Sequence, residues 1–275
     1  MEALKTVNGV QTQQDCGVCG TNSLRINGME GPYTAVLIDG APIMGSLASV
    51  YALNGINPAL IEQIEIIKGP ASTLYGTEAM GGVVNVITKD PRFAPKATVN
   101  VFNTSHGEWN ADGAMAGGGG RANFLLSASA SGAGRFVDDN RDGFNDLQRY
   151  TRLALFGKFA VGAPNDRVMQ VAVKQYHETR LGGVDLSTTA ERCSAINYGE
   201  SIRTDRTELV GSYRLSTNAR NMHANFSVTD HHQDSCYGTT RYLAAQQVAF
   251  GQLVWNSQLG RRHDVLAGAT VRYQG

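Results

Sequence analysis

Long segments in which apolar and polar side chains alternate run through residues 97–275 and restrict the fold more than any other feature of the sequence. In 222–229, the even-numbered residues are apolar and the odd-numbered ones are polar. In 265–273, the odd-numbered residues are apolar and oppose polar or small ones, with Leu266 as the exception. Two-faced strands of roughly 9–11 residues match a strand that crosses a membrane, whereas strands of soluble proteins average roughly 5–6 residues. The pattern therefore predicts membrane-spanning β-strands.

The connections between these segments alternate in length. Short turns are predicted near 118–120, 162–165, 216–219 and 260–262, and long polar loops at about 132–149, 179–204 and 232–246. Short turns on one side and long loops on the other are typical of an outer-membrane β-barrel. We count about nine strands, and because single-chain bacterial barrels have an even number, we expect the barrel to be incomplete. The alternative at this point is a soluble β-sandwich with long loops.

Composition narrows the function classes. The 275 residues include 32 glycines and only 17% charged residues, which suits many strands and turns better than a helical enzyme. Acidic and basic residues balance at 24 each, which argues against nucleic-acid binding. No apolar run approaches the roughly 18 residues of a membrane-spanning helix. The first residues do not form a signal peptide and the last stop within an alternating segment, so we expect the sequence to be cut at both ends.

Residues 1–91 lack the long alternating segments, and a change of composition near Pro91 and Pro95 marks a domain boundary. Within this part, 35–38 and 83–87 predict buried strands, and 57–61 predicts a helical turn. Residues 61–89 predict a strand, a turn at Gly69-Pro70, a short helical turn ending at Gly76 and a second strand entered through paired glycines.

These motifs carry a family resemblance. The segments Ile61–Gly76 and Ala79–Lys89, with Val36–Pro42 and Arg25–Met29 before them, resemble the plug domain of TonB-dependent outer-membrane receptors. The resemblance covers roughly residues 4–90. It implies a membrane β-barrel, 22-stranded in the family, with an N-terminal α+β plug domain. Residues 1–91 would be an N-terminally truncated plug, and residues 92–275 a C-terminally truncated part of the barrel.

The resemblance also implies a function and partners. Such receptors lie in the bacterial outer membrane, in contact with its lipid, and take up a scarce nutrient such as a ferric siderophore, haem or cobalamin. Their energy comes from TonB with its ExbB/ExbD complex, through a segment that would precede residue 1. The resemblance implies no enzyme, no nucleic-acid partner and no required cofactor. The alternative function is a passive adhesin, or a docking barrel for phages and bacteriocins.

Ligand in this family contacts the outward-facing loops of the plug, which by position are 15–23 and 43–53. The resemblance therefore gives these candidate ligand-binding residues: Asp15, Cys16, Cys19, Asn22, Met44, Ser46 and Tyr51. Met44 and Tyr51 are equally well explained as plug core or plug surface.

The four cysteines form two pairs. Cys16 and Cys19 could form a tight disulfide, contact a soft metal or, least favoured, carry redox chemistry. Cys193 and Cys236 fall in two predicted loops on one side of the barrel. A disulfide between them is the simplest interpretation, and a soft-metal cluster with His231 and His232 is the alternative.

Residues 138–146 begin like a calcium loop. Asp138, Asn140 and Asp142 supply oxygen at alternate positions, Gly143 follows, and Asp146 lies beyond. Arg149 stands at the twelfth position, where an EF-hand requires glutamate, which excludes an EF-hand. A calcium-ordered acidic loop remains, and because the family's cobalamin transporters have one, it favours cobalamin slightly. The alternative is a hydrated turn rich in Asp and Asn.

Sequence motifs of enzymes are missing. The chain has no phosphate-binding Gly-rich loop and no Gly-x-Ser-x-Gly nucleophile motif. His177-Glu178 starts a zinc-protease motif, but Leu181 stands where the second histidine is needed. No motif in the sequence therefore supports an enzyme.

Overall fold

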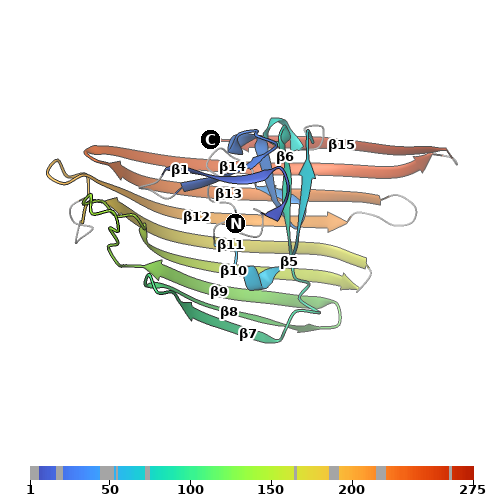
Figure 1. Cartoon of the computed structure of the whole chain (residues 1–275). Coiled ribbons are helices and arrows are strands. Elements are labelled where there is room, and N and C mark those ends of the chain that lie inside the picture. The colour runs from blue at the N-terminus through green and yellow to red at the C-terminus, as the bar shows by residue number, and fades with distance from the viewer. Residues whose placement is uncertain are drawn as a thin grey trace.

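The computed structural model describes residues 6–16, 21–43, 53, 55–71, 75–163, 166–185, 192–214, 221–259 and 262–275. It contains a large sheet from the second part of the chain and a smaller body from the first part, which lies against one face of that sheet (Figure 1). No helix among these residues has the length and apolar character needed to cross a membrane.

The large sheet confirms the predicted nine strands. In chain order they are β7 (Ala97–Asn103), β8 (Glu108–Gly119), β9 (Ala122–Ala133), β10 (Arg149–Ala163), β11 (Asp166–Gly183), β12 (Gly199–Arg214), β13 (Asn221–Tyr237), β14 (Thr240–Leu259) and β15 (His263–Gln274). Each pairs antiparallel with the next, and β7 and β15 lie at the two edges, so the described sheet is an open part of a barrel.

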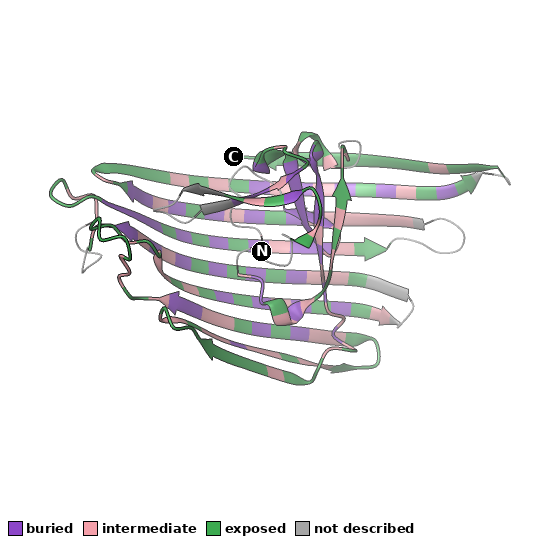
Figure 2. Cartoon of the chain, in the orientation of Figure 1, coloured by how far each residue is buried: buried purple, intermediate pink, exposed green. Residues whose placement is uncertain are grey.

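The alternation in sequence becomes an alternation between two faces. Side chains such as Val228, Leu155 and Phe159 point away from the smaller body and are about half exposed. Their neighbours on the opposite face, including Lys174 and Arg206, are almost fully buried. Figure 2 shows the resulting stripes along β10 to β14. An apolar outer face and a polar inner face are the arrangement of a membrane barrel wall.

The prediction of a long loop at 232–246 is wrong. Residues 232–246 form the ends of β13 and β14, which meet in a two-residue turn at Gly238 and Thr239. Gly238 has φ 58°, the left-handed conformation that such tight turns require. Polarity misled the prediction because strands that continue beyond the apolar part of the wall carry polar residues on both faces. The predicted loops 132–149 and 179–204 shorten to 134–148 and 184–198 for the same reason.

The smaller body contains two sheets. A hairpin pairs β1 (Val10–Cys16) with β2 (Thr21–Ile26). A four-stranded sheet has the order β4 (Ala41–Ile43), β3 (Thr34–Ile38), β6 (Gly82–Thr88) and β5 (Ile61–Lys68), with β3 and β6 parallel. The apolar segments predicted as buried strands are β3 and β6, and each forms part of the core.

Short 3-10 turns join these strands. The described residues form η2 (Gly31–Tyr33), η3 (Pro58–Leu60) and η4 (Thr77–Ala79), and η4 begins after Gly76, where the predicted helical turn was expected to end. The Asn57 side chain caps η3 by accepting the N–H of Ala59 at 2.8 Å, which explains the helical turn predicted at 57–61.

The smaller body packs directly on the inner face of the large sheet. Val36, Ile38 and Ile43 share a buried apolar cluster with Leu125 and Phe156 of the wall. Strand β4 contacts β12 and β13, and β5 and β6 cross the wall strands at a steep angle (Figure 1). The inner face is therefore covered by the first part of the chain.

Gly55 allows the closest approach. It has φ +76°, and a Cβ at this position would overlap the ring of Tyr176 and lie 3.1 Å from the Cβ of Ala154. We expect Gly55→Ala to lower the free energy of unfolding by roughly 1–3 kcal/mol, because overpacking and backbone strain both destabilise the folded state. Chemical denaturation in detergent measures the change.

Gly28→Ala is the matched control. Gly28 has φ +79°, but nothing lies within 4 Å of its hypothetical Cβ, so this variant carries only the backbone strain. Equal destabilisation by the two variants would contradict the close packing of Gly55 on Tyr176.

Candidate functional site

The junction between plug-like body and wall is built around a buried ion pair. Lys158 of β10 is 2% exposed, and its Nζ lies 2.9 Å from Oδ2 of Asp39, directly after β3. The same Nζ donates to Oγ1 of Thr88, the last residue of β6, at 2.8 Å. Asp39 in turn accepts the N–H and the hydroxyl of Thr88. One lysine of the wall therefore holds the ends of two parallel strands.

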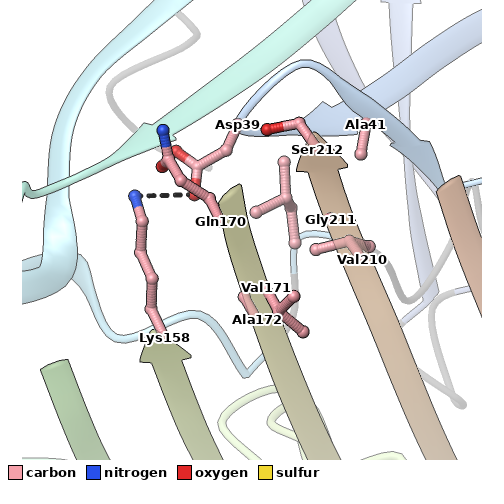
Figure 3. Close-up of a pocket in the computed structure, with 10 residues that line it drawn as sticks. Asp39, Ala41, Lys158, Gln170, Val171, Ala172, Val210, Gly211 and Ser212 are labelled. Atoms are coloured by element: carbon pink, nitrogen blue, oxygen red, sulfur yellow. Dashed lines mark ion pairs between the residues drawn. The ribbon is translucent and has the colours of Figure 1, made fainter. Parts of the chain in front are cut away.

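A small cavity lies beside this pair (Figure 3). It has about 10 Å³ of free volume, room for about one water molecule, and polar lining from Asp39, Gln170 and Ser212. Figure 3 shows Gln170 and Ser212 at the same level of the cavity as Asp39, with Val171, Ala172 and Val210 lower in the view. The ion pair thus has polar neighbours, although most of the contact between the smaller body and the wall is apolar.

Within the described residues, polar contacts join the two bodies at three other places. Ser227 of β13 donates to the carbonyl of Pro42 at 2.6 Å. Asn57 donates to Oδ2 of Asp112 at 3.1 Å and to Ser127 at 3.2 Å. Glu78 pairs with Arg272 of β15 at 2.6 Å. Together with the Lys158 junction, these contacts run from β8 to β15, so the smaller body is fixed across the wall.

Buried charges continue along the inner wall. On β11 and β12, Glu208 pairs with Lys174 at 2.8 Å and with Arg206. Glu178 pairs with Arg152 at 2.5 Å and with Arg180. The prediction from sequence missed these groups, although charges at 174, 178 and 180, and again at 206 and 208, were a visible signal on one face of each strand.

A disulfide between Cys193 and Cys236 ties segment 192–198 to β13, with Cα atoms 5.3 Å apart. Arg192 reinforces it by donating to the Oδ2 and the carbonyl of Asp234, at 3.1 and 2.8 Å. Arg241 of β14 binds the same carboxylate. The cysteines are therefore joined to each other, in the pairing that was the simplest interpretation of the sequence.

The two long loops contact each other at this end of the wall. The rings of Phe144 and Tyr198 lie 6.3 Å apart, and the N–H of Asn145 donates to Gly183. Tyr198 also donates to Glu200 at 2.5 Å, and this bond is the main cause of a raised pKa of Tyr198. Segments 134–148 and 192–198 are thus parts of one folded loop cluster.

The predicted calcium loop uses its oxygens for turns. Asp138 accepts the N–H groups of Asp142 and Gly143, Asn140 accepts that of Asp142, and Asp146 accepts that of Asp139. Among the described residues, no group of three or more His, Cys, Asp or Glu side chains is placed to hold a metal ion. Calcium binding here stays a prediction.

The candidate ligand residues of the plug loops are placed only in part. The backbones of Asp15 and Cys16 belong to β1 and that of Asn22 to β2. Cys19, Met44, Ser46 and Tyr51 lie outside the described residues, and so does any pairing of Cys16 with Cys19. Their role in ligand binding therefore stays a prediction.

The Lys158 junction can be tested by removing its charge. We expect Lys158→Met to lower the free energy of unfolding by roughly 2–4 kcal/mol, because Asp39 keeps a largely buried charge without its cation. Denaturation in detergent measures the loss, and protease protection of residues 6–90 shows whether the smaller body leaves the wall.

Lys96→Met is the control, because Lys96 is exposed. The double variant Lys158→Met with Asp39→Asn should recover part of the loss, since no charge is then buried alone. A loss no larger than that of Lys96→Met would contradict the role of the ion pair.

The disulfide is expected to act on the unfolded chain and on its own loop segment. Cys193→Ser should lower the free energy of global unfolding by roughly 2–4 kcal/mol, because the cross-link between residues 43 apart in the sequence restricts the unfolded chain. Opening of 192–198 should increase about tenfold, because a covalent restraint on the segment is lost. Hydrogen exchange of amides 192–198 against those of β12 measures this. Unchanged protection would mean that Arg192 alone holds the segment.

Comparison with known proteins identifies the first part of the chain. The family model described as TonB-dependent Receptor Plug Domain matches residues 1–83. The ferric enterobactin receptor PirA of Pseudomonas aeruginosa is 35% identical over 139 residues, covering 46% of this chain and 18% of that protein. The vitamin B12 transporter BtuB of Vibrio vulnificus is 28% identical over 169 residues, covering 57% of this chain and 26% of the transporter. The chain thus spans about a quarter or less of these relatives.

Solved structures superpose on nearly the whole of this chain. The siderophore receptor PirA from Acinetobacter baumannii superposes with a TM-score of 0.68 at 16% identity, covering 97% of this chain and 44% of the receptor. A mutant of the ferric enterobactin receptor PfeA from Pseudomonas aeruginosa gives 0.70 at 14% identity, covering 99% and 46%. Residues 1–83 thus match the plug domain of TonB-dependent receptors, and the chain as a whole has the fold of the receptors on which it superposes.

Proposed function

We propose that this chain is part of an outer-membrane receptor that takes up a scarce nutrient, an iron chelate, haem or cobalamin, with energy from TonB. The observation that carries the proposal is the plug held against the inner wall through Lys158, Asp39 and Thr88. A barrel that only displays loops to phages or bacteriocins needs no plug with a buried polar attachment. The names of the relatives, an enterobactin receptor and a B12 transporter, support the same class of ligand.

We further propose that residues 1–91 act as the plug and residues 92–275 as part of the barrel. The open sheet supports this division, because β7 and β15 each leave one strand edge without a partner among the described residues. Unpaired edges are not stable in a bilayer, so additional strands would close the wall. The matched structures, of which the chain spans less than half, are long enough to supply them.

Partners and location follow from this proposal. The exposed outer residues of the wall, such as Leu155 and Val228, would contact lipid of the outer membrane. TonB with ExbB/ExbD would supply the force that moves the plug. The ligand would arrive at the end of the wall where segments 134–148 and 192–198 lie.

Uptake by the full receptor containing this sequence tests the proposal. Cells that produce it, with and without a functional TonB gene, are given radiolabelled ferric enterobactin, haem or cyanocobalamin. We expect one ligand to bind the cell surface in both strains and to enter the cell only when TonB is present.

Binding without TonB-dependent entry would contradict the proposal and favour the passive docking function. Cells without the receptor give the background in both strains. Entry that does not depend on TonB would equally exclude the proposed mechanism.

A further inference from the structure

Strand β5 is the least buried strand of the four-stranded sheet. None of its eight residues is buried, whereas all five residues of β3 and five of the seven in β6 are. In Figure 2, β5 is drawn in the colours of exposed and intermediate residues. It also lies at the edge of its sheet, and among the described residues only β6 pairs with it.

The polar attachments of this sheet to the wall belong to its other strands. Asp39 follows β3 and Thr88 ends β6, and both bind Lys158 of the wall. The carbonyl of Pro42 in β4 accepts the hydroxyl of Ser227 at 2.6 Å. Among the described residues, every hydrogen bond of a β5 side chain is made within the smaller body. The polar contacts with the wall therefore hold β3, β4 and β6, but not β5.

The hairpin of β1 and β2 holds β5 instead. Ile64 and Ile66 of β5 pack against an apolar cluster that contains Leu24 of β2. Lys68, the last residue of β5, donates to the carbonyl of Asn8 at 2.6 Å, two residues before β1 begins. Apolar packing and a hydrogen bond thus join β5 to the first residues of the chain.

The hairpin can be opened from one end. The first residue of β1, Val10, pairs with the last residue of β2, Ile26. Next to this pair, the N–H of Asn27 donates to the carbonyl of Gly9 at 2.7 Å. The chain continues from β2 to β3, which is held at Lys158. A force on the N-terminal side of Gly9 would therefore part β1 from β2 one residue pair after another.

From these contacts we propose that the β1–β2 hairpin is a latch on β5, a segment that holds the strand until the segment is removed. Once it is removed, β5 leaves β6, and the plug opens on the β5 side while β3, β4 and β6 stay on the wall. The inference rests on the proposed function, because TonB would supply the force. It deepens that function by naming the side of the plug on which the nutrient passes.

The physical reason is the loss of apolar burial. Without the hairpin, Ile64 and Ile66 face water, and their burial no longer stabilises the pairing of β5 with β6. On the other face of β5, Glu65 accepts bonds from the amides of Gln63 and Asn85. Opening at β5 thus offers hydrogen-bonding groups to a passing nutrient and leaves the apolar cluster shared with the wall closed.

Hydrogen exchange of the full receptor in detergent tests the latch without transport. Leu24→Ala removes a side chain that is 3% exposed from the cluster beneath β5. We expect exchange of amides 61–68 to rise roughly tenfold or more, because local opening of β5 becomes easier. Exchange of amides 34–38 in β3 should stay unchanged.

Leu125→Ala is the matched control, because Leu125 is 2% exposed but belongs to the cluster between the smaller body and the wall. It should not raise exchange of 61–68 above that of 34–38. Equal exchange of 61–68 in the Leu24 and Leu125 variants would overturn the latch. If Leu24→Ala does not fold, Lys68→Met removes only the exposed bond to Asn8 and should raise exchange of 61–68 roughly threefold.

A cross-link between β5 and β6 tests the side of opening. Glu65 and Asn85 lie opposite each other in the two antiparallel strands, a spacing that a disulfide can bridge. The double variant Glu65→Cys with Asn85→Cys is given radiolabelled ferric enterobactin, haem or cyanocobalamin, whichever the unaltered receptor takes up. We expect unchanged binding, at least tenfold lower TonB-dependent uptake when oxidised, and recovery after reduction. Mass spectrometry of tryptic peptides shows whether the two strands are joined.

The single variants Glu65→Cys and Asn85→Cys, oxidised and reduced in the same way, control for the lost side chains and for the disulfide between Cys193 and Cys236. Uptake by the oxidised double variant equal to that of the single variants would overturn opening at β5. If the unaltered receptor shows no TonB-dependent uptake but hydrogen exchange responds as expected, the proposed function is overturned, whereas the latch is supported.

Discussion

Charged side chains on the inner face of the sheet need a covering surface that satisfies them. Lys158 shows the constraint in its simplest form, because its ammonium is nearly inaccessible and its partners, Asp39 and Thr88, come from the plug. An ammonium buried without such partners would be strongly unfavourable. The wall and the plug are thus complementary in charge as well as in shape. The apolar packing of Ile38 on Phe156 adds stability but, being non-directional, does not fix the register between the two bodies.

Local pattern was enough to predict most of the fold. Alternation over 222–229 and the apolar segments 35–38 and 83–87 depend only on neighbouring residues, and each became the expected strand. The hairpin at 232–246 was missed because polarity was taken as a sign of a loop. Where a strand continues past the apolar part of the wall, both faces meet water or charge, and polarity no longer distinguishes a strand from a loop.

Of the contacts at the site, the sequence predicted the disulfide but not the buried ion pair. Cys193 and Cys236 were candidates for a disulfide because both fell at the same end of the predicted barrel, and the structure joins them. The pairing of Lys158 with Asp39 joins the wall to the smaller body, and no spacing in the sequence encodes it. For the acidic residues of 138–146, the sequence left both calcium binding and a hydrated turn open. In the structure, their oxygens accept backbone N–H groups within the turn. Composition alone does not distinguish that use from ion binding.

The attachment of β3 and β6 to one lysine has a mechanical consequence. The two strands are parallel, and Asp39 and Thr88 stand at the same end of both. A load passing through Lys158 is therefore divided between two strands that are pulled in the same direction. Two strands that are pulled in the same direction from the same end do not slide past one another, so the hydrogen bonds between them carry little of the load. The centre of the plug sheet is thus built to be displaced as one piece, while its edge strands can separate first.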